Sequence, residues 1–239
     1  MNQIKWKSCI KENLITNFLA EFYLQIRTVM RYVVKGSYSQ YKEDVWVREI
    51  FLGGGVKTRE IKYVDIGANH YKRNNNTYLF YKNGASGIIV EADPKLCTGL
   101  RKKRKRDIVC NSCIGLEKGK TVDFYRLSLP TRNTMDKDMA DRAVDAGVKI
   151  KEVIQIPCIK VNDLLEQYAF VPDYMSIDIE GMDYAVLRTI DFNKFPIKVI
   201  VAEYSDELIC GENMNQYMKK CGYQIYKETK GNVIYCLPQ

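Results

Sequence analysis

The chain has 239 residues, 46% of them hydrophobic, and a formal net charge of +8 at pH 7, which permits one domain with a sizeable core and disfavours a disordered or repeat protein. Its eight cysteines are scattered, most of them in apolar runs as reduced thiols would be, and no uncharged run is long enough to span a bilayer or to act as a secretory signal. We therefore expect a soluble protein of the cytoplasm.

The first part of the chain predicts one long amphipathic helix over about residues 11–34, where apolar side chains recur at helical spacing. Gly36 would end this helix, so we expect a helical extension over residues 1–37 and a main domain over residues 38–239. The apolar face of the helix suits a dimer surface, a lid over the site or a peripheral membrane contact. The sequence does not choose among these roles.

A second predicted helix, Glu43 to Leu52, precedes the stretch around which the main domain is organised, Lys62 to His70. This stretch is typical of a short buried strand that ends in an acid, Asp65, and continues into a small-residue loop. Gly67 and Ala68 let the backbone turn tightly and approach a ligand closely. Such a loop is where a nucleotide-like cofactor sits in an α/β protein.

The next elements agree with a cofactor-binding sheet. The polar run Asn74 to Thr77 predicts a capped start for a crossover helix that begins at Tyr78. A second buried strand, Gly87 to Glu91, then ends in a carboxylate 24 residues beyond Gly67. An acid at that place accepts hydrogen bonds from ribose hydroxyls, because its two oxygens can bridge a vicinal diol.

A third helix opens at Asp93-Pro94 and runs into six consecutive basic residues, Arg101 to Arg106. The run suits the solvated end of a helix, where cations complement the negative dipole. It also suits an anionic partner such as nucleic acid, lipid or an acidic glycan. Both interpretations stay open.

The middle of the chain predicts a strand over residues 107–114 and then a half-exposed strand, Thr121 to Leu127, paired with Val153 to Ile159. Between these two partners lies a polar stretch, Pro130 to Gly147, with loop character and a short helix. A long excursion on the ligand side of a sheet is often where the second substrate is chosen.

The last third predicts a fourth strand (Tyr174 to Gly181), a helix containing Leu187 to Ile190, a fifth strand (Lys198 to Tyr204) and an antiparallel hairpin, Tyr223 to Lys227 with Asn232 to Cys236. The expected fold is therefore a doubly wound, Rossmann-like α/β sheet of the methyltransferase type. A nicotinamide dehydrogenase would instead continue with parallel strands and helices.

Several blocks, taken in order and spacing, resemble the FkbM-type S-adenosylmethionine-dependent methyltransferases over about residues 38–236. The blocks are Ser39-Gln40, Glu43-Asp44, Val64 to His70, Asn76-Thr77-Tyr78, Glu91 to Pro94, Val161 to Leu165, Ser176 to Gly181 with Leu187, and Glu203. One departure is Tyr71-Lys72-Arg73 where such loops commonly have a further glycine. It would place a cation near a carboxylate of the cofactor or of the substrate.

The resemblance implies S-adenosylmethionine as cofactor, with the Gly67 loop around its methionyl part, Glu91 at the ribose and the segment 111–113 at the adenine edge. No residue spacing demands a metal ion. The cofactor-binding candidates are Gln40, Asp65, Gly67, Ala68, Asn69, Asn76, Thr77, Glu91, Ala92, Asp93, Asn111, Ser112, Cys113 and Asp178.

Three residues are the catalytic candidates. His70 is the only histidine and follows the loop directly, so it either acts as general base or packs against the loop. Asp178 and Glu180, which the resemblance places at the transferred methyl group, either serve as base or orienting acceptor or bind backbone amides at the strand end.

The expected activity is O-methylation of a hydroxyl on a saccharide, a glycan precursor or a related small molecule, with the substrate class taken from the resemblance. The alternative is a non-catalytic protein that binds nucleic acid or a membrane surface through residues 101–106. We do not expect a nucleic-acid partner, because the basic residues are not interleaved with aromatic ones.

Overall fold

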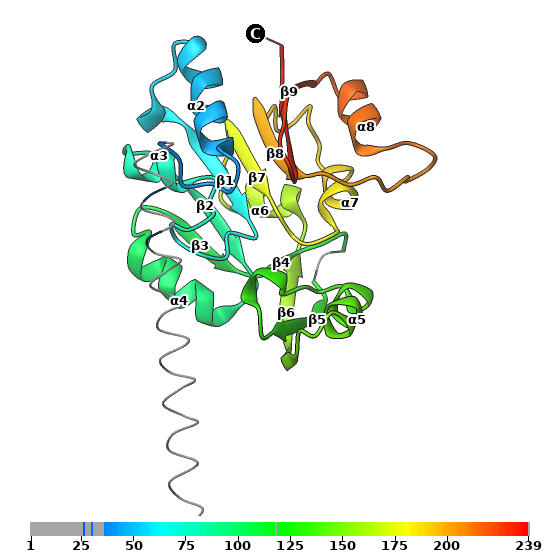
Figure 1. Cartoon of the computed structure of the whole chain (residues 1–239). Helices are drawn as coiled ribbons and strands as arrows, with labels where there is room; N and C mark the ends of the chain where they lie inside the picture. Colours follow the sequence, from blue (N-terminus) through cyan, green and yellow to red (C-terminus); the bar gives the residue numbers. More distant parts are fainter. Residues whose placement is uncertain (1–25, 27–29, 31–35, 118, 239) are drawn as a thin grey trace, which may run out of the picture.

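The computed structural model describes residues 26, 30, 36–117 and 119–238 (Figure 1). The helix predicted over residues 11–34 therefore lies outside the described residues except for Ile26 and Met30, which are helical and exposed. In the described part of the chain, no helix combines the length and the apolar character that crossing a bilayer requires.

The core of the molecule is a seven-stranded sheet in the order β3-β2-β1-β7-β8-β10-β9, as the α/β prediction expects. All its pairings are parallel except those of β10 with β8 and with β9. The bounds are β1 Lys62–Ile66, β2 Ser86–Glu91, β3 Ile108–Asn111, β7 Tyr174–Ile177, β8 Val199–Glu203, β9 Gln224–Glu228 and β10 Asn232–Cys236. The doubly wound sheet with a closing antiparallel pair is thus confirmed.

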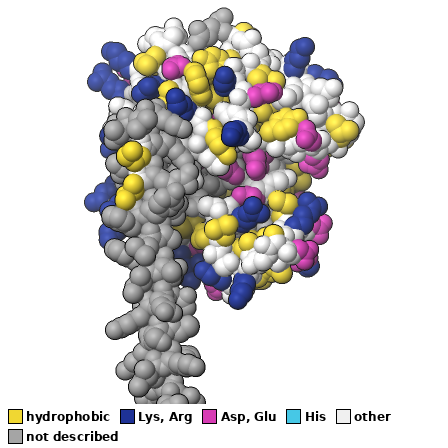
Figure 2. Space-filling view, viewed as in Figure 1, with side chains coloured by type: hydrophobic (Ala, Val, Ile, Leu, Met, Phe, Trp, Pro, Cys, Tyr) yellow, Lys and Arg dark blue, Asp and Glu magenta, His cyan; other side chains and the backbone are white. Residues whose placement is uncertain are grey.

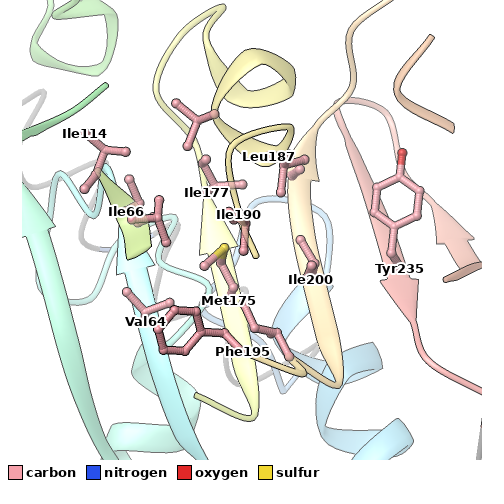
Figure 3. Close-up of a cluster of buried hydrophobic side chains, with 14 of the residues drawn as sticks. Val64, Ile66, Ile114, Met175, Ile177, Leu187, Ile190, Phe195, Ile200 and Tyr235 are labelled. Carbon is pink, nitrogen blue, oxygen red and sulfur yellow. The ribbon is translucent and has the colours of Figure 1, made fainter. Parts of the chain in front are cut away.

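Both faces of the sheet are covered, which explains why its central strands are apolar almost throughout. The helices are α2 Glu43–Gly53, α3 Tyr78–Lys82, α4 Pro94–Lys103, α5 Lys137–Asp145, α6 Val161–Gln167, α7 Asp183–Leu187 and α8 Met214–Lys220. Val64 and Ile66 point to one face, toward Leu187 and the neighbouring side chains (Figure 3). Tyr63 points to the other face, in the cluster formed with α2 and α3.

Strand register brings three predicted loops to one edge of the sheet. Ile66 at the end of β1 pairs with Val90 on one side and with Ile177 on the other. Because parallel strands share a direction, Gly67, Glu91 and Asp178 follow at the same edge.

A small second sheet, ordered β4-β6-β5, lies with α5 at one end of the central sheet (Figure 1). Its strands are β4 Cys113–Ile114, β5 Thr121–Leu127 and β6 Ile150–Ile159, and β5 pairs antiparallel with β6 as predicted. The excursion between them contains a 3₁₀ turn, Pro130–Arg132, and α5.

Several predicted elements have different bounds in the structure, among them the fourth strand, which ends at Ile177 and not at Gly181, and β6, which begins at Ile150. The strand expected over residues 107–114 is divided at Ser112, whose hydroxyl donates to the Pro157 carbonyl at 2.8 Å and turns the chain toward β6. The helix expected to contain Leu187 to Ile190 ends at Leu187 and begins at Asp183.

Candidate active site

A cavity of about 690 Å³ opens at the carboxyl ends of β1, β2 and β7. This volume lies within the ordinary range for small-molecule and cofactor sites. The predicted site residues that line the cavity are Gln40, Gly67, Ala68, Asn69, His70, Glu91, Ala92, Ser112, Cys113, Asp178 and Glu180. Those that do not line it are Asp65, Asn76, Thr77, Asp93 and Asn111.

Gly67 is the point where the cofactor loop packs against the end of β7. Its φ of 80° lies in the left-handed region, and a Cβ atom there would stand 1.9 Å from the backbone oxygen of Asp178. The backbone amide of Gly67 donates to the Val90 carbonyl at 2.9 Å. Only glycine fits this crossing, so the loop lies directly over the three strand ends.

Glu91 joins the cofactor loop to the loop that follows β2. Its Oε2 accepts from the backbone amide of Asn69 and its Oε1 from that of Asp93, both at 2.8 Å. Burial of the carboxyl group raises its pKa to about 7 despite these two bonds. Glu91 is therefore a held acceptor group on the cavity wall.

Asp65 holds the loop from behind the cavity. Its Oδ2 accepts from the Thr77 hydroxyl at 2.6 Å and from the Asn75 amide at 3.0 Å. The same Asn75 amide group also donates to the Ala68 carbonyl at 3.3 Å. Thr77 lies at the N-terminus of α3, yet its hydroxyl binds Asp65 and does not cap the helix as predicted.

The basic run is not uniformly solvated, because Arg104 is fully buried while its five neighbours in the run are exposed. The side chain pairs with Asp107 at 2.7 Å. All five of its N–H groups have acceptors: Asp107 Oδ2, Tyr71 O, Asn75 Oδ1, Tyr63 Oη and Thr77 Oγ1. On the face shown in Figure 2, basic side chains are spread over several regions.

His70 uses Nδ1 as an acceptor. The backbone amides of Lys72 and Arg73 both donate to this atom, at 3.0 and 2.9 Å. A neutral ring with an unprotonated Nδ1 carries its proton on Nε2, so Nε2 is a donor. Of the two roles considered for His70, this geometry favours the one in which the ring holds the loop.

Asp178 and Glu180 form an acidic wall together with Glu203 at the end of β8. Asp178 is reached by solvent through the cavity, although protein atoms surround its carboxyl group. Desolvation and the charge of Glu203 raise the pKa of Asp178 to about 7, and desolvation with the charge of Asp178 does the same for Glu180. Glu180 adopts φ 53°, which turns the chain sharply beside Gly181.

Asp183 lies behind this wall. Its Oδ2 accepts from the Ile179 amide at 3.3 Å, and its buried Oδ1 has no partner among the described residues. Burial and the charges of Asp178 and Glu203 hold the pKa of Asp183 well above its usual range.

Asp93 and Asn111 brace the adenine side that was predicted from the resemblance. Asp93 caps α4 through the Lys95 amide and pairs with Arg126 of β5 at 2.8 Å. The Asn111 amide donates to the carbonyls of Glu91 and Ala92 at 3.0 and 2.8 Å. Both side chains act on the walls of the cavity from outside it.

Residues 37–39, just before α2, are buried and held by side-chain hydrogen bonds. Asp44 accepts from the hydroxyls of Ser37 and Ser39 at 2.5 and 2.8 Å. Glu43 accepts from Asn232 of β10 at 2.8 Å. These bonds place Gln40 and its neighbour on the cavity wall.

Other lining residues were not among the sequence candidates. They are Tyr41, Arg73, Asn74, Phe124, Pro130, Thr131, Asn133, Thr134, Met135, Ile179 and Lys230, with Ile66, Val90 and Ile114. Five of them come from residues 130–135, so the position of the excursion was the one available signal. Among the described residues no group of three or more His, Cys, Asp or Glu side chains could hold a metal ion.

A comparison with known protein families identifies the family of the chain. A family model described as "Methyltransferase FkbM domain" matches residues 65–225. No curated protein sequence matches the chain.

The fold is similar to that of several solved structures. A methyltransferase from Geobacter sulfurreducens is 10% identical, with 95% of this chain and 96% of that one covered and a TM-score of 0.42. An O-methyltransferase from Bacillus cereus, solved with SAH, is 11% identical, with 90% and 100% covered and a TM-score of 0.40. A TehB-like SAM-dependent methyltransferase from Corynebacterium glutamicum is 8% identical, with 93% and 100% covered and a TM-score of 0.39.

Proposed function

The chain belongs to the FkbM methyltransferase family, and from this premise we propose that it methylates a hydroxyl group of a saccharide, a glycan precursor or a related small molecule. The family is S-adenosylmethionine-dependent. The observation that carries the proposal is the acidic pair Asp178 and Glu180, which lines the same cavity as Gly67 and Glu91.

The residues at the cavity fit the cofactor. Gly67 lets the loop pack closely against the Asp178 backbone, and the loop 67–69, which lines the cavity, would hold the methionyl part. Glu91 is an acceptor suited to the two hydroxyls of a ribose, while Ser112 and Cys113 border the place for the adenine. When bound, the cofactor supplies a methyl group activated by its positive sulfur.

The protein then has to align the acceptor hydroxyl and remove its proton. We assign proton removal to Glu180, because the charge of Arg132 in the excursion lowers the pKa of this carboxyl group. The excursion is the segment expected to contact the substrate that accepts the methyl group. Asp178, whose backbone packs on Gly67, belongs to the cofactor side. A pKa of about 7 leaves Glu180 largely ionised at mildly alkaline pH and able to accept the proton.

His70 would contribute as a donor and as a brace of the loop. Its Nδ1 is engaged by two backbone amides, so the ring cannot take a proton there without losing both bonds. This geometry supports a carboxylate as the base and a role for the imidazole in positioning the loop.

The experiment is to incubate the full chain with methyl-labelled S-adenosylmethionine and a panel of sugars and sugar derivatives, and to treat the products with mild alkali. Label on an ether oxygen survives alkali, whereas label on a carboxyl ester is released. We expect alkali-stable label with the wild type and its loss in Glu180→Gln. Alkali-labile or nitrogen-bound label would contradict O-methylation of a hydroxyl.

A further inference from the structure

Arg104 is the feature of the molecule that the proposed function leaves unused. It is a fully buried guanidinium whose five donors are all satisfied. Burying a cation is costly unless it is paired and hydrogen-bonded, so such complete satisfaction requires a built site. Gly87 contributes to it, because a Cβ atom there would stand 2.4 Å from the ring of Tyr63.

Three of the five acceptors of Arg104 belong to the cofactor loop and its far end. The carbonyl of Tyr71 accepts at 3.1 Å, the amide oxygen of Asn75 at 3.2 Å and the hydroxyl of Thr77 at 3.0 Å. The ion pair with Asp107 fixes the guanidinium from the opposite side. One planar group therefore sets the positions of three points along residues 67–77.

Two of these acceptors, Thr77 and Asn75, also form hydrogen bonds with Asp65. Thr77 accepts from Arg104 and donates to Asp65, and Asn75 does the same through its oxygen and its amide group. Asn75 also donates to Ala68, which lines the cavity. A continuous series of bonds thus runs from Arg104 to the wall of the cofactor site.

Resting on the proposed function, we propose that Arg104 is a positioning residue of the cofactor site: it acts through Thr77 and Asn75 to keep Asp65 an acceptor and the loop 67–77 in its binding geometry. Arg104 does not line the cavity. Its effect on the cofactor passes through the loop.

The charge of Asp65 depends on the groups packed around it. Burial raises the pKa of Asp65, and Arg104 opposes this rise. Among the described residues, the other titratable groups that act on Asp65 are acidic: Asp107 just before β3, Glu91 from β2, Tyr174 from β7 and Asp178 just after it. Arg104 is the cation of this set.

Removal of that cation would therefore raise the pKa of Asp65 further and favour its protonated form. Thr77 and Asn75 both donate to Oδ2 of Asp65, and hydrogen bonds to an ionised acceptor are stronger than those to a neutral one. Protonation would therefore weaken both contacts and, with them, the hold of Asn75 on Ala68. Higher pH would restore the carboxylate and, with it, the loop.

The test is calorimetric binding of S-adenosylhomocysteine (SAH) to the full chain carrying Arg104→Met, with Lys105→Met as the matched control from the same run. We expect SAH to bind Arg104→Met about tenfold more weakly than the wild type at about pH 6.5, and the variant-to-wild-type ratio of affinities to recover toward one at about pH 9, since one unit of pH changes the ionised fraction of a group up to tenfold. Lys105→Met should follow the wild type throughout, because Lys105 is exposed.

Two further variants keep the proposal falsifiable if Arg104→Met does not fold. Thr77→Val removes the bridging hydroxyl without uncovering the Arg104–Asp107 pair, and it should weaken SAH binding too. In an Asp65→Asn background, Arg104→Met should lose its pH dependence and weaken binding less than it does alone.

The positioning role would be overturned if the ratio of the Arg104→Met affinity to the wild-type affinity were the same at every pH. It would also be overturned if the effects of Arg104→Met and Asp65→Asn on SAH binding simply added. Either result would leave Arg104 with a purely structural role. These outcomes differ from failure of the proposed function, in which the wild type itself would not bind SAH.

Discussion

The backbone amide of Asn69 donates to the carboxyl group of Glu91 at 2.8 Å, and this bond ties the loop after β1 to the end of β2. Glu91 therefore binds the protein backbone and, in the proposed complex, would also bind the ribose in the cavity. Its second oxygen is bound in the same way by the Asp93 amide. Substitutions at Glu91 test how much its carboxyl group contributes to cofactor binding.

Glu91→Ala should weaken SAH binding by about 100-fold, because hydrogen bonds to a charged group contribute about 1.5–3 kcal/mol each. Glu91→Gln keeps one acceptor oxygen and should lose less. Calorimetry compares both with Glu117→Ala, an exposed glutamate that does not line the cavity. Equal affinity of all three variants would remove Glu91 from the cofactor site.

Gly67→Ala should abolish SAH binding at any concentration that can be reached, since the added methyl group would overlap the Asp178 carbonyl. The left-handed φ of 80° adds strain to the same substitution. Gly53→Ala is the matched control, because a Cβ atom there meets nothing within 4 Å. Binding by Gly67→Ala close to that of the wild type would show that the loop is not where the cofactor sits.

His70→Asn should retain more methyl transfer than His70→Ala, because an asparagine oxygen can still accept from the amides of Lys72 and Arg73. The measurement is kcat as a function of pH for the two variants and the wild type. If His70 only holds the loop, the pH profile keeps its shape while the rate falls. Disappearance of a titration from the profile in both variants would restore the histidine as the base.

The raised pKa of Glu91 also predicts how the cofactor-free protein responds to pH. A carboxyl whose folded pKa lies above its unfolded value stabilises the fold below the unfolded pKa and loses that contribution as pH rises through the folded pKa. The folded value is about 7 and the ordinary one 4.5. Unfolding free energy should therefore fall between about pH 4.5 and pH 7, on the order of 3 kcal/mol for this group.

Denaturant unfolding of the wild type and of Glu91→Gln across this range measures the effect. The variant cannot ionise at this position, so its stability should decline less over the same interval. A decline of the same size in both proteins would mean that Glu91 is not the group responsible.

Much of the fold follows from the sequence because the central strands are short apolar runs bounded by glycine and acids. Tyr63 to Ile66 and Ile88 to Val90 are of this kind, and their buried positions agree with it. Strand-end acids also placed Glu91 and Asp178 at one edge correctly. The closing antiparallel hairpin was also predicted, whereas the order of the strands comes from the structure.

Features that depend on three-dimensional partners could not be predicted in this way. Nothing in six consecutive basic residues marks Arg104 as the buried one, because its acceptors come from distant points of the chain. The helices α6 and α8 were not predicted, although the capping box of Asn213 and Gln216 is a sequence signal for α8. The residues that the excursion adds to the cavity depend on how it folds back over the sheet.

The central claim is that the cavity over Gly67 and Glu91 holds the cofactor of a methyltransferase. Titration of SAH into the full chain by calorimetry tests it most directly, with Glu91→Ala measured beside the wild type. The account predicts saturable binding of one SAH per chain by the wild type and markedly weaker binding by the variant. Absence of binding to a folded wild type, or equal binding by both proteins, would contradict it.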